Sequence, residues 1–297
     1  MSAGPARIPE SPDRRVRGYH DGDVDVVLSV DDVAREAESL RTEIPEEHLL
    51  ALAGNAPFLS LTGLHAGYGN MEILHGLTLH VARGQSICLI GPNGAGKSTV
   101  LHSIYGFARV FQGQVTIGAE EPRREITRLT PERKLREARI AYILQDKSVF
   151  PDMTVEENLL MGGFLLHSRA KAKQAAERVF ERNERLANRR KHPAKVLSGG
   201  ERRLLEISRA LVMEPDVLLV DEPSIGLEPR FIDMVFEILE RLQREDGKTI
   251  VMVEQNARKG LEFADVGYVL VSGQVALAGE GRELLANPDV GRLFLGG

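Results

Sequence analysis

The 297-residue chain is short of cysteine, of long apolar runs and of positive charge, and each shortage excludes a class of protein. Its single cysteine, Cys88, rules out an intrachain disulfide. No stretch holds eighteen consecutive apolar residues, so we expect no membrane-spanning helix. The N-terminus has no apolar signal region, and a net charge of −5 gives no general reason to expect nucleic-acid binding. Together these features are typical of a protein of the reducing cytoplasm.

Residues 1–56 differ in composition from the rest of the chain. They carry twelve acidic and six basic side chains, with prolines at positions 5, 9 and 12. Because such a segment has little apolar surface to bury, we expect about the first twenty residues to be disordered. From Asp31 to Ala53 the apolar spacing is helical but Pro45 interrupts it, which predicts two short helices. A solvated extension is the plainer interpretation, and a docking or regulatory arm is the alternative.

From Phe58 onward the pattern alternates between buried strands and helices. Three short apolar runs are typical of parallel strands buried on both faces, namely Ser86–Ile90, Val217–Val220 and Thr249–Val253. Helical patterns lie between them, which predicts an α/β layer fold built on a parallel sheet. We therefore expect an acidic extension, residues 1–56, followed by one folded domain, residues 57–297.

A glycine-rich motif follows the first of these strands. The stretch from Gly91 to Ser98 fits G-x-x-x-x-G-K-[ST], and it precedes a helix that should begin near Lys97. Backbone N–H groups and the helix N-terminus would then face a phosphate anion. Lys97 is expected to reach the β- and γ-phosphates of ATP, and the Ser98 hydroxyl to bind Mg²⁺. The candidate nucleotide-binding residues here are Gly91, Pro92, Asn93, Gly94, Ala95, Gly96, Lys97, Ser98 and Thr99. A turn without a ligand is the alternative.

Two carboxylates follow the second apolar run. Val217–Val220 leads directly into Asp221 and Glu222, at the carboxyl edge where parallel sheets bind ligands. We expect Asp221 to hold the Mg²⁺ shell through water, and Glu222 to orient and deprotonate the attacking water. By itself the pattern indicates only a strand followed by an acidic turn. Its occurrence in the same chain as the glycine-rich motif favours the catalytic interpretation.

A third motif, LSGGE at Leu197–Glu201, precedes a helix that should run to about Met213. Ser198 and Glu201 have the spacing of a capping box, so by itself the motif predicts a well-capped helix. It lies 23 residues before Asp221 and downstream of the glycine-rich motif. In that position it resembles the signature of ABC transporter nucleotide-binding subunits, with Glu201 where glutamine is commonest.

The resemblance covers about residues 58–297 and implies further site residues. In that family two subunits sandwich ATP head to tail, so Ser198, Gly199 and Gly200 would bind the γ-phosphate of a nucleotide on the partner chain. Tyr68 matches the aromatic residue that stacks on adenine. Gln145 matches the glutamine that links Mg²⁺ to the membrane subunits. The metal-binding residues implied in this way are Ser98, Gln145 and Asp221.

The resemblance also implies a P-loop ATPase fold, with a parallel-sheet core, an antiparallel β subdomain and a helical subdomain at about residues 146–200. It is weaker over Arg169–Lys191, which contains nine basic residues and whose apolar face, Ala176, Val179, Phe180 and Leu186, should pack locally. We interpret the basic residues as a solvated helical face and expect no nucleic-acid partner.

One departure points to a branch of the family. Most such subunits carry a histidine after the third strand, whereas Gln255 stands there, 34 residues beyond Asp221. A glutamine amide can hydrogen-bond the γ-phosphate but cannot become a cation. With Glu222 it makes the candidate catalytic pair. The variant resembles the branch that powers branched-chain amino-acid importers, as does the string Met153–Gly162.

The resemblance implies a place at the cytoplasmic face of the plasma membrane. The expected partners are a second ABC ATPase (a paralogue or another copy of this chain), two membrane permeases and, indirectly, a solute-binding protein. Two alternatives remain open. One is the ATPase of a lipid or lipopolysaccharide exporter, which Ser198–Arg203 also resembles. The other is an ABC ATPase outside transport, although such proteins usually have two fused halves or a long coiled coil.

Overall fold

The computed structural model describes residues 36, 44–145 and 148–295. The predicted disorder of the first residues, and the first of the two helices predicted within Asp31–Ala53, lie outside the described residues. Helix α2 (Glu46–Leu52) begins directly after Pro45, as we predicted for the second of the two helices. It is docked, because Leu49 is buried and His48 Nε2 donates to the Ala278 carbonyl oxygen at 3.1 Å. The boundary between residues 56 and 57 stays a prediction.

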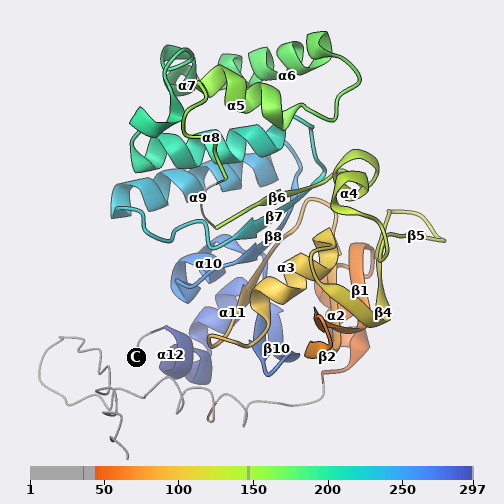
Figure 1. Ribbon diagram of the computed structural model, residues 1–297. Coiled ribbons are helices and arrows are strands. Elements are labelled where there is room, and N and C mark those ends of the chain that lie inside the picture. Colours follow the sequence, from red (N-terminus) through yellow and green to blue (C-terminus); the bar gives the residue numbers. More distant parts are fainter. Residues whose placement is uncertain (1–35, 37–43, 146–147, 296–297) are drawn as a thin grey trace, which may run out of the picture.

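A six-stranded sheet forms the centre of the molecule (Figure 1). Its order is β10 (Gln274–Glu280), β9 (Val266–Val271), β3 (Ser86–Ile90), β8 (Thr249–Val253), β7 (Val217–Asp221) and β6 (Ile140–Ile143). Neighbouring strands from β9 to β6 are parallel, and β10 runs antiparallel to β9. The three predicted runs are β3, β7 and β8, and all their residues are buried. The predicted α/β fold with a parallel core is therefore confirmed.

A four-stranded antiparallel sheet lies beside this core. Its order is β2 (Met71–Ala82), β1 (Pro57–Tyr68), β4 (Arg109–Ile117) and β5 (Arg124–Glu125). Helix α3 (Lys97–Tyr105) lies between the two sheets and contacts strands of both. Side chains alternate across β3: Ile87 and Leu89 pack on this side, whereas Cys88 and Ile90 pack on the other. The antiparallel subdomain is confirmed.

Helices cover the opposite face of the central sheet. They are α9 (Pro229–Arg244), α10 (Ala257–Phe263), α11 (Gly281–Ala286) and α12 (Pro288–Phe294). The short α4 (Pro131–Glu137) lies against the edge strand β6. Among the described residues, no helix combines the length and apolarity that crossing a membrane requires.

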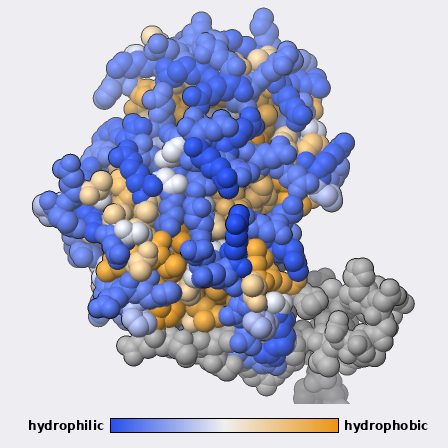
Figure 2. Space-filling view, turned by 180° about the vertical axis from the view of Figure 1, so that it is seen from behind, coloured by the Kyte–Doolittle hydropathy of each residue, from blue (hydrophilic) through white to orange (hydrophobic). Residues whose placement is uncertain are grey.

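A helical subdomain forms one end of the molecule (Figure 1). It contains α5 (Val155–Gly162), α6 (Arg169–Arg182), α7 (Glu184–Asn188), a 3₁₀ turn (Ala194–Val196) and α8 (Gly199–Leu211). The basic segment that we expected as one helix is interrupted at Asn183, whose backbone angles, φ −135° and ψ 81°, are not helical. Its apolar face is buried in the subdomain core as predicted. Seen from behind, hydrophilic residues cover most of this end (Figure 2).

Candidate nucleotide site

The glycine-rich motif lies at the carboxyl edge of the central sheet, between β3 and α3. Gly91 has φ 144°, and a Cβ there would lie 2.1 Å from the Leu270 carbonyl oxygen, so only glycine fits against β9. Gly96, with φ 97°, is the N-cap of α3 and offers no side chain to cap it. The first N–H groups of α3 are therefore left uncapped, which is the condition for holding an anion.

A cavity of about 220 Å³ opens beside this loop. Its lining residues are Ile73, Asn93, Gly94, Gly96, Lys97, Ser98, Thr99 and Glu222. The structure thus brings the phosphate-loop residues and the carboxylate after β7 together around one space. Gly91, Pro92 and Ala95 are part of the same loop but do not line the cavity.

Lys97 supplies the positive charge of the cavity. Its amino group donates to the carbonyl oxygens of Gly91 and Pro92, at 2.8 and 3.0 Å. Burial lowers the pKa of Lys97, while the nearby carboxylates of Glu222 and Asp221 raise it. The cation thus has two neutral acceptors and two carboxylates close by, and it lines a space where a phosphate fits.

The two carboxylate oxygens of Asp221 have different partners. Oδ1 accepts a hydrogen bond from the Ser98 hydroxyl at 3.2 Å, and Oδ2 accepts one from the Tyr142 hydroxyl at 2.8 Å. Ser98 and Asp221 were predicted to lie together around a metal. Tyr142 was missed, because an aromatic residue in an apolar run is usually a core residue and its hydroxyl partner comes from another strand.

Glu222 leaves the line of β7 with an uncommon backbone angle, φ 43°. Its carboxylate Oε2 accepts a hydrogen bond from the Gln145 side-chain amide at 2.8 Å, so two predicted site residues are in contact. Burial, and then the charge of Asp221, raise the pKa of Glu222, whereas Lys97 opposes this shift. A carboxylate with a raised pKa on the lining of this cavity is suited to proton transfer.

Tyr68 ends β1 at the rim of an aromatic cluster. The residue is 41% exposed, and its ring meets that of His102 edge-on with the centroids 5.9 Å apart. The Tyr68 hydroxyl is hydrogen-bonded to His102 Nδ1. The cluster continues through Tyr105, Phe107 and Tyr142. The exposed part of the Tyr68 ring is free to stack on a planar base.

The LSGGE motif caps α8 as its spacing predicted. The Ser198 hydroxyl accepts from the Glu201 N–H at 3.3 Å, and the Glu201 carboxylate accepts from the Ser198 N–H at 2.9 Å. A Cβ on Gly200 would lie 2.1 Å from the Phe231 ring, so close packing of α8 on α9 also requires this glycine. None of Ser198, Gly199 and Gly200 lines the phosphate cavity of the same chain.

Gln255 lies on the surface between β8 and α10, outside the lining of the phosphate cavity. The preceding Glu254 is buried and accepts hydrogen bonds from the Ser224 hydroxyl and the Asn256 N–H. Burial raises the pKa of Glu254. Sequence reasoning missed this link between the loops after β7 and β8, since a charged residue after a strand usually signals exposure.

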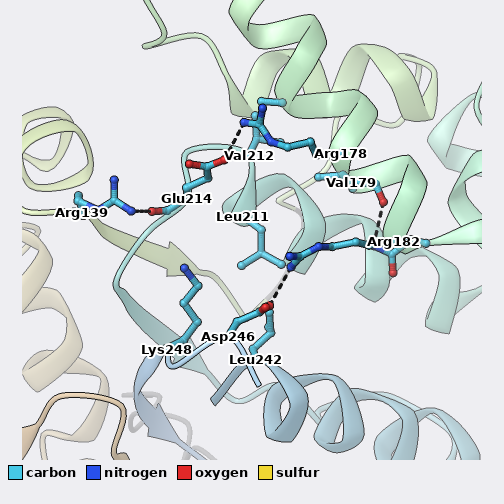
Figure 3. A pocket seen from close by; sticks show the side chains of 12 residues that line it. Arg139, Arg178, Val179, Arg182, Leu211, Val212, Glu214, Leu242, Asp246 and Lys248 are labelled. Atoms are coloured by element: carbon cyan, nitrogen blue, oxygen red, sulfur yellow. Dashed lines mark hydrogen bonds and ion pairs between the residues drawn. The ribbon is translucent and has the colours of Figure 1, made fainter. Parts of the chain in front are cut away.

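A second cavity, of about 280 Å³, lies where the helical subdomain meets the core (Figure 3). It is lined by basic side chains, and ion pairs engage its arginines, whereas Lys248 donates to the Pro215 carbonyl oxygen. Arg178 pairs with Glu214 at 2.7 Å, and Arg182 pairs with Asp246 at 2.9 Å. We assign no ligand to this cavity, because its arginines already have carboxylate partners.

Comparison with known proteins identifies the family. The family described as ABC transporter matches residues 74–225. The chain is 40% identical to the high-affinity branched-chain amino acid transport ATP-binding protein BraG of Pseudomonas aeruginosa, over 80% of this chain and 100% of the relative. It is 37% identical to the probable branched-chain amino acid transport ATP-binding protein LivF of Archaeoglobus fulgidus, over 78% and 96% of the two chains.

Solved structures agree. The ADP conformation of an ATP-binding cassette of an ABC transporter superposes with a TM-score of 0.70 at 28% identity, covering 81% of this chain and 99% of the other. A dimeric post-hydrolysis state of a cassette bound to ADP and phosphate gives 0.64 at 25% identity, covering 75% and 99%. The chain therefore belongs to the ABC transporter family, as an ATP-binding subunit whose ATPase activity is coupled to transport.

Proposed function

We propose that this subunit powers an importer of branched-chain amino acids or of a related small polar solute. The observation that carries the proposal is the match to two ATP-binding proteins of branched-chain amino acid transport over 96% to 100% of their lengths. Gln255, in place of the usual histidine, supports the same branch. The chain would act at the cytoplasmic face of the plasma membrane with two permeases and, indirectly, a solute-binding protein.

The site fits Mg-ATP. Mg²⁺ prefers oxygen ligands and is usually held by one or two carboxylates together with substrate phosphates. Ser98 Oγ and Asp221 Oδ1, 3.2 Å apart, are such oxygens. When bound, Mg²⁺ would neutralise charge on the β- and γ-phosphates. The uncapped N–H groups of α3 and the Lys97 amino group would hold the phosphates, and Tyr68 would stack on the adenine.

Glu222 is the group that we assign to proton transfer. Its raised pKa and its place on the cavity lining suit a base that accepts a proton from the attacking water. Gln145 holds one oxygen of this carboxylate by its amide, which leaves the other oxygen for water. We expect Gln145 to release Glu222 when it turns towards the metal, so that the same side chain links the site to the membrane subunits.

The complete site needs a second ATPase. Ser198, Gly199 and Gly200 do not line the phosphate cavity of their own chain. The Ser198 cap of α8 accepts from the Glu201 N–H and not from those of the two glycines, so the first turn of α8 can still face an anion. We infer that they close over the nucleotide of a partner, as a second ATPase would close over this chain's nucleotide. The partner is a paralogue or another copy of the chain. Contacts that exist only with the γ-phosphate would favour the closed pair.

Affinity purification from detergent-solubilised native membranes tests this function. Mass spectrometry should find two different permeases, a second ATPase and a solute-binding protein, and the binding protein can then be screened against branched-chain amino acids. Recovery of lipid or lipopolysaccharide export components would favour an exporter. Recovery of ribosomal or DNA-repair components without a membrane protein would overturn the proposal.

A further inference from the structure

Tyr142 and Asp221 are in contact because of the register of two parallel strands. Tyr142 on β6 pairs with Leu219 on β7. Side chains alternate along a strand, so Leu219 and Asp221 share a face of the sheet. The Tyr142 side chain on that face extends one step along β7 and donates its hydroxyl hydrogen to Asp221 Oδ2 at 2.8 Å. The contact therefore rests on the backbone of two neighbouring strands.

The Tyr142 ring is held on several sides. Its centroid lies 5.8 Å from that of His102, 5.4 Å from that of Tyr105 and 5.7 Å from that of Phe107. Asp221 is only 6% exposed. A carboxylate oxygen can only accept a hydrogen bond, so the Tyr142 hydroxyl is the donor in this pair. A fixed ring thus presents a fixed donor to a carboxylate that has little freedom to turn towards water.

Because of the hydrogen bond from Tyr142, the two carboxylate oxygens of Asp221 have different roles. Oδ2 is occupied by Tyr142, whereas Oδ1 points to the Ser98 hydroxyl at the phosphate cavity. Groups that hydrogen-bond a metal-binding carboxylate fix its orientation, and removing one typically costs about 10- to 100-fold in metal affinity. This geometry therefore predicts a role for Tyr142 that acts through the orientation of Asp221.

We propose that Tyr142 is a positioning residue that holds the Asp221 carboxylate with Oδ1 turned to the metal, and so sets the affinity of the site for Mg²⁺ in the nucleotide complex. The proposal rests on the proposed role of Asp221 in Mg²⁺ binding. It concerns the coupling between metal and nucleotide, because the Tyr142 hydroxyl donates to Asp221, whereas Lys97 and the Tyr68 hydroxyl have other hydrogen-bond partners.

The experiment compares the affinity of the full chain for the non-hydrolysable analogue AMP-PNP with excess Mg²⁺ and with EDTA, by isothermal titration calorimetry. The ratio of the two dissociation constants measures the coupling to the metal. Tyr142→Phe removes only the hydroxyl and should reduce this ratio about tenfold, with the affinity in EDTA unchanged. An unchanged ratio, or equal weakening in both conditions, would overturn the proposal.

Tyr105→Phe is the matched control. It removes a hydroxyl from the same aromatic cluster, and among the described residues burial is the only influence found on the Tyr105 hydroxyl, with no hydrogen-bond partner. The ratio should stay at the wild-type value, and a loss as large as that of Tyr142→Phe would refute a specific role for Tyr142. Thermal unfolding checks that each variant folds. Tyr142→Met, which also lacks the hydroxyl, repeats the test if the phenylalanine variant does not fold.

A double-mutant cycle with Asp221→Asn separates this proposal from the function on which it rests. Asp221→Asn should itself abolish most of the coupling, and adding Tyr142→Phe should then reduce the ratio no further. If Asp221→Asn leaves the ratio unchanged, the metal role of Asp221 is wrong and the proposal fails with it. If Asp221→Asn acts and Tyr142→Phe does not, only the proposal fails.

Discussion

The phosphate cavity lies beside the loop that precedes α3, and the junction cavity lies where the helical subdomain meets the core. Charged side chains line both cavities, but their cations have different partners. At the junction, Arg178 and Arg182 each meet a carboxylate across the gap between α6 and the core (Figure 3). In the phosphate cavity, the Lys97 amino group donates to two carbonyl oxygens, and α3 begins without a side-chain cap. The first set of charges is neutralised within the chain, whereas the second is arranged for an anion from outside.

Volume alone does not locate this site. The junction cavity is the larger, at about 280 Å³ against about 220 Å³. A ligand there would have to compete with ion pairs that already exist. A phosphate in the smaller cavity would accept hydrogen bonds from the first N–H groups of α3 and from the Lys97 amino group. These bonds to an anion would be stronger than those that the loop carbonyls provide.

Glu222→Gln should produce the largest effect, because it removes the proposed base and keeps the size of the side chain. We expect single-turnover ATP hydrolysis at this site to fall by about 10²- to 10⁴-fold, while ATP binding is retained. Quench-flow on the assembled complex measures the step. Glu240→Gln on α9, an exposed carboxylate paired with Arg244, is the control and should hydrolyse ATP normally. A normal rate in Glu222→Gln would remove Glu222 as the base.

Lys97→Met should come next, because it deletes the cation that faces the phosphates. We expect ATP binding to weaken by about 2–5 kcal/mol, the usual loss when one member of a desolvated charge pair is truncated. Calorimetry on the purified chain measures it. Lys248→Met, a matched change on the junction cavity, should leave ATP affinity unaltered. Similar losses in the two variants would mean that the two cavities do not differ as we describe.

Sequence patterns were enough to predict those elements whose determinants lie close together in the chain. Ser86–Ile90 and Thr249–Val253 were predicted with the bounds that the structure shows. The prediction Val217–Val220 ended one residue early, because Asp221 still pairs with Val253 although the apolar run is over. The phosphate loop and the cap of α8 are local as well, since each depends on the order of residues within one turn or loop.

Contacts between strands could not be predicted in the same way. Tyr142 and Asp221 are 79 residues apart, and they meet only because β6 lies beside β7 in register. The same holds for Ser224 and Glu254, which follow neighbouring strands. Without strand order, a tyrosine in an apolar run and a glutamate after a strand are indistinguishable from ordinary core and surface residues.

Gln255→His tests a smaller effect, at an exposed residue outside the lining of the phosphate cavity. A histidine can carry a positive charge that glutamine cannot, so it can stabilise developing charge on the γ-phosphate. We expect turnover of the assembled complex to rise by about tenfold at most, which corresponds to about 1.4 kcal/mol of the barrier. Steady-state ATPase assays in proteoliposomes measure this. An unchanged or lower rate would contradict the idea that Gln255 slows this site.

The junction ion pairs should give the smallest effect. Arg182 is 70% exposed, and Arg182 and Asp246 together form a surface pair, for which a coupling energy of about 0.2–1 kcal/mol is typical. Urea unfolding of Arg182→Gln, Asp246→Asn and the double variant measures this coupling, which should shrink further at high salt because exposed charges are screened. ATP affinity should not change in any of the three. A clear loss of ATP affinity would show that the junction communicates with the phosphate cavity, and the contrast between a self-neutralised and an anion-binding cavity would no longer hold.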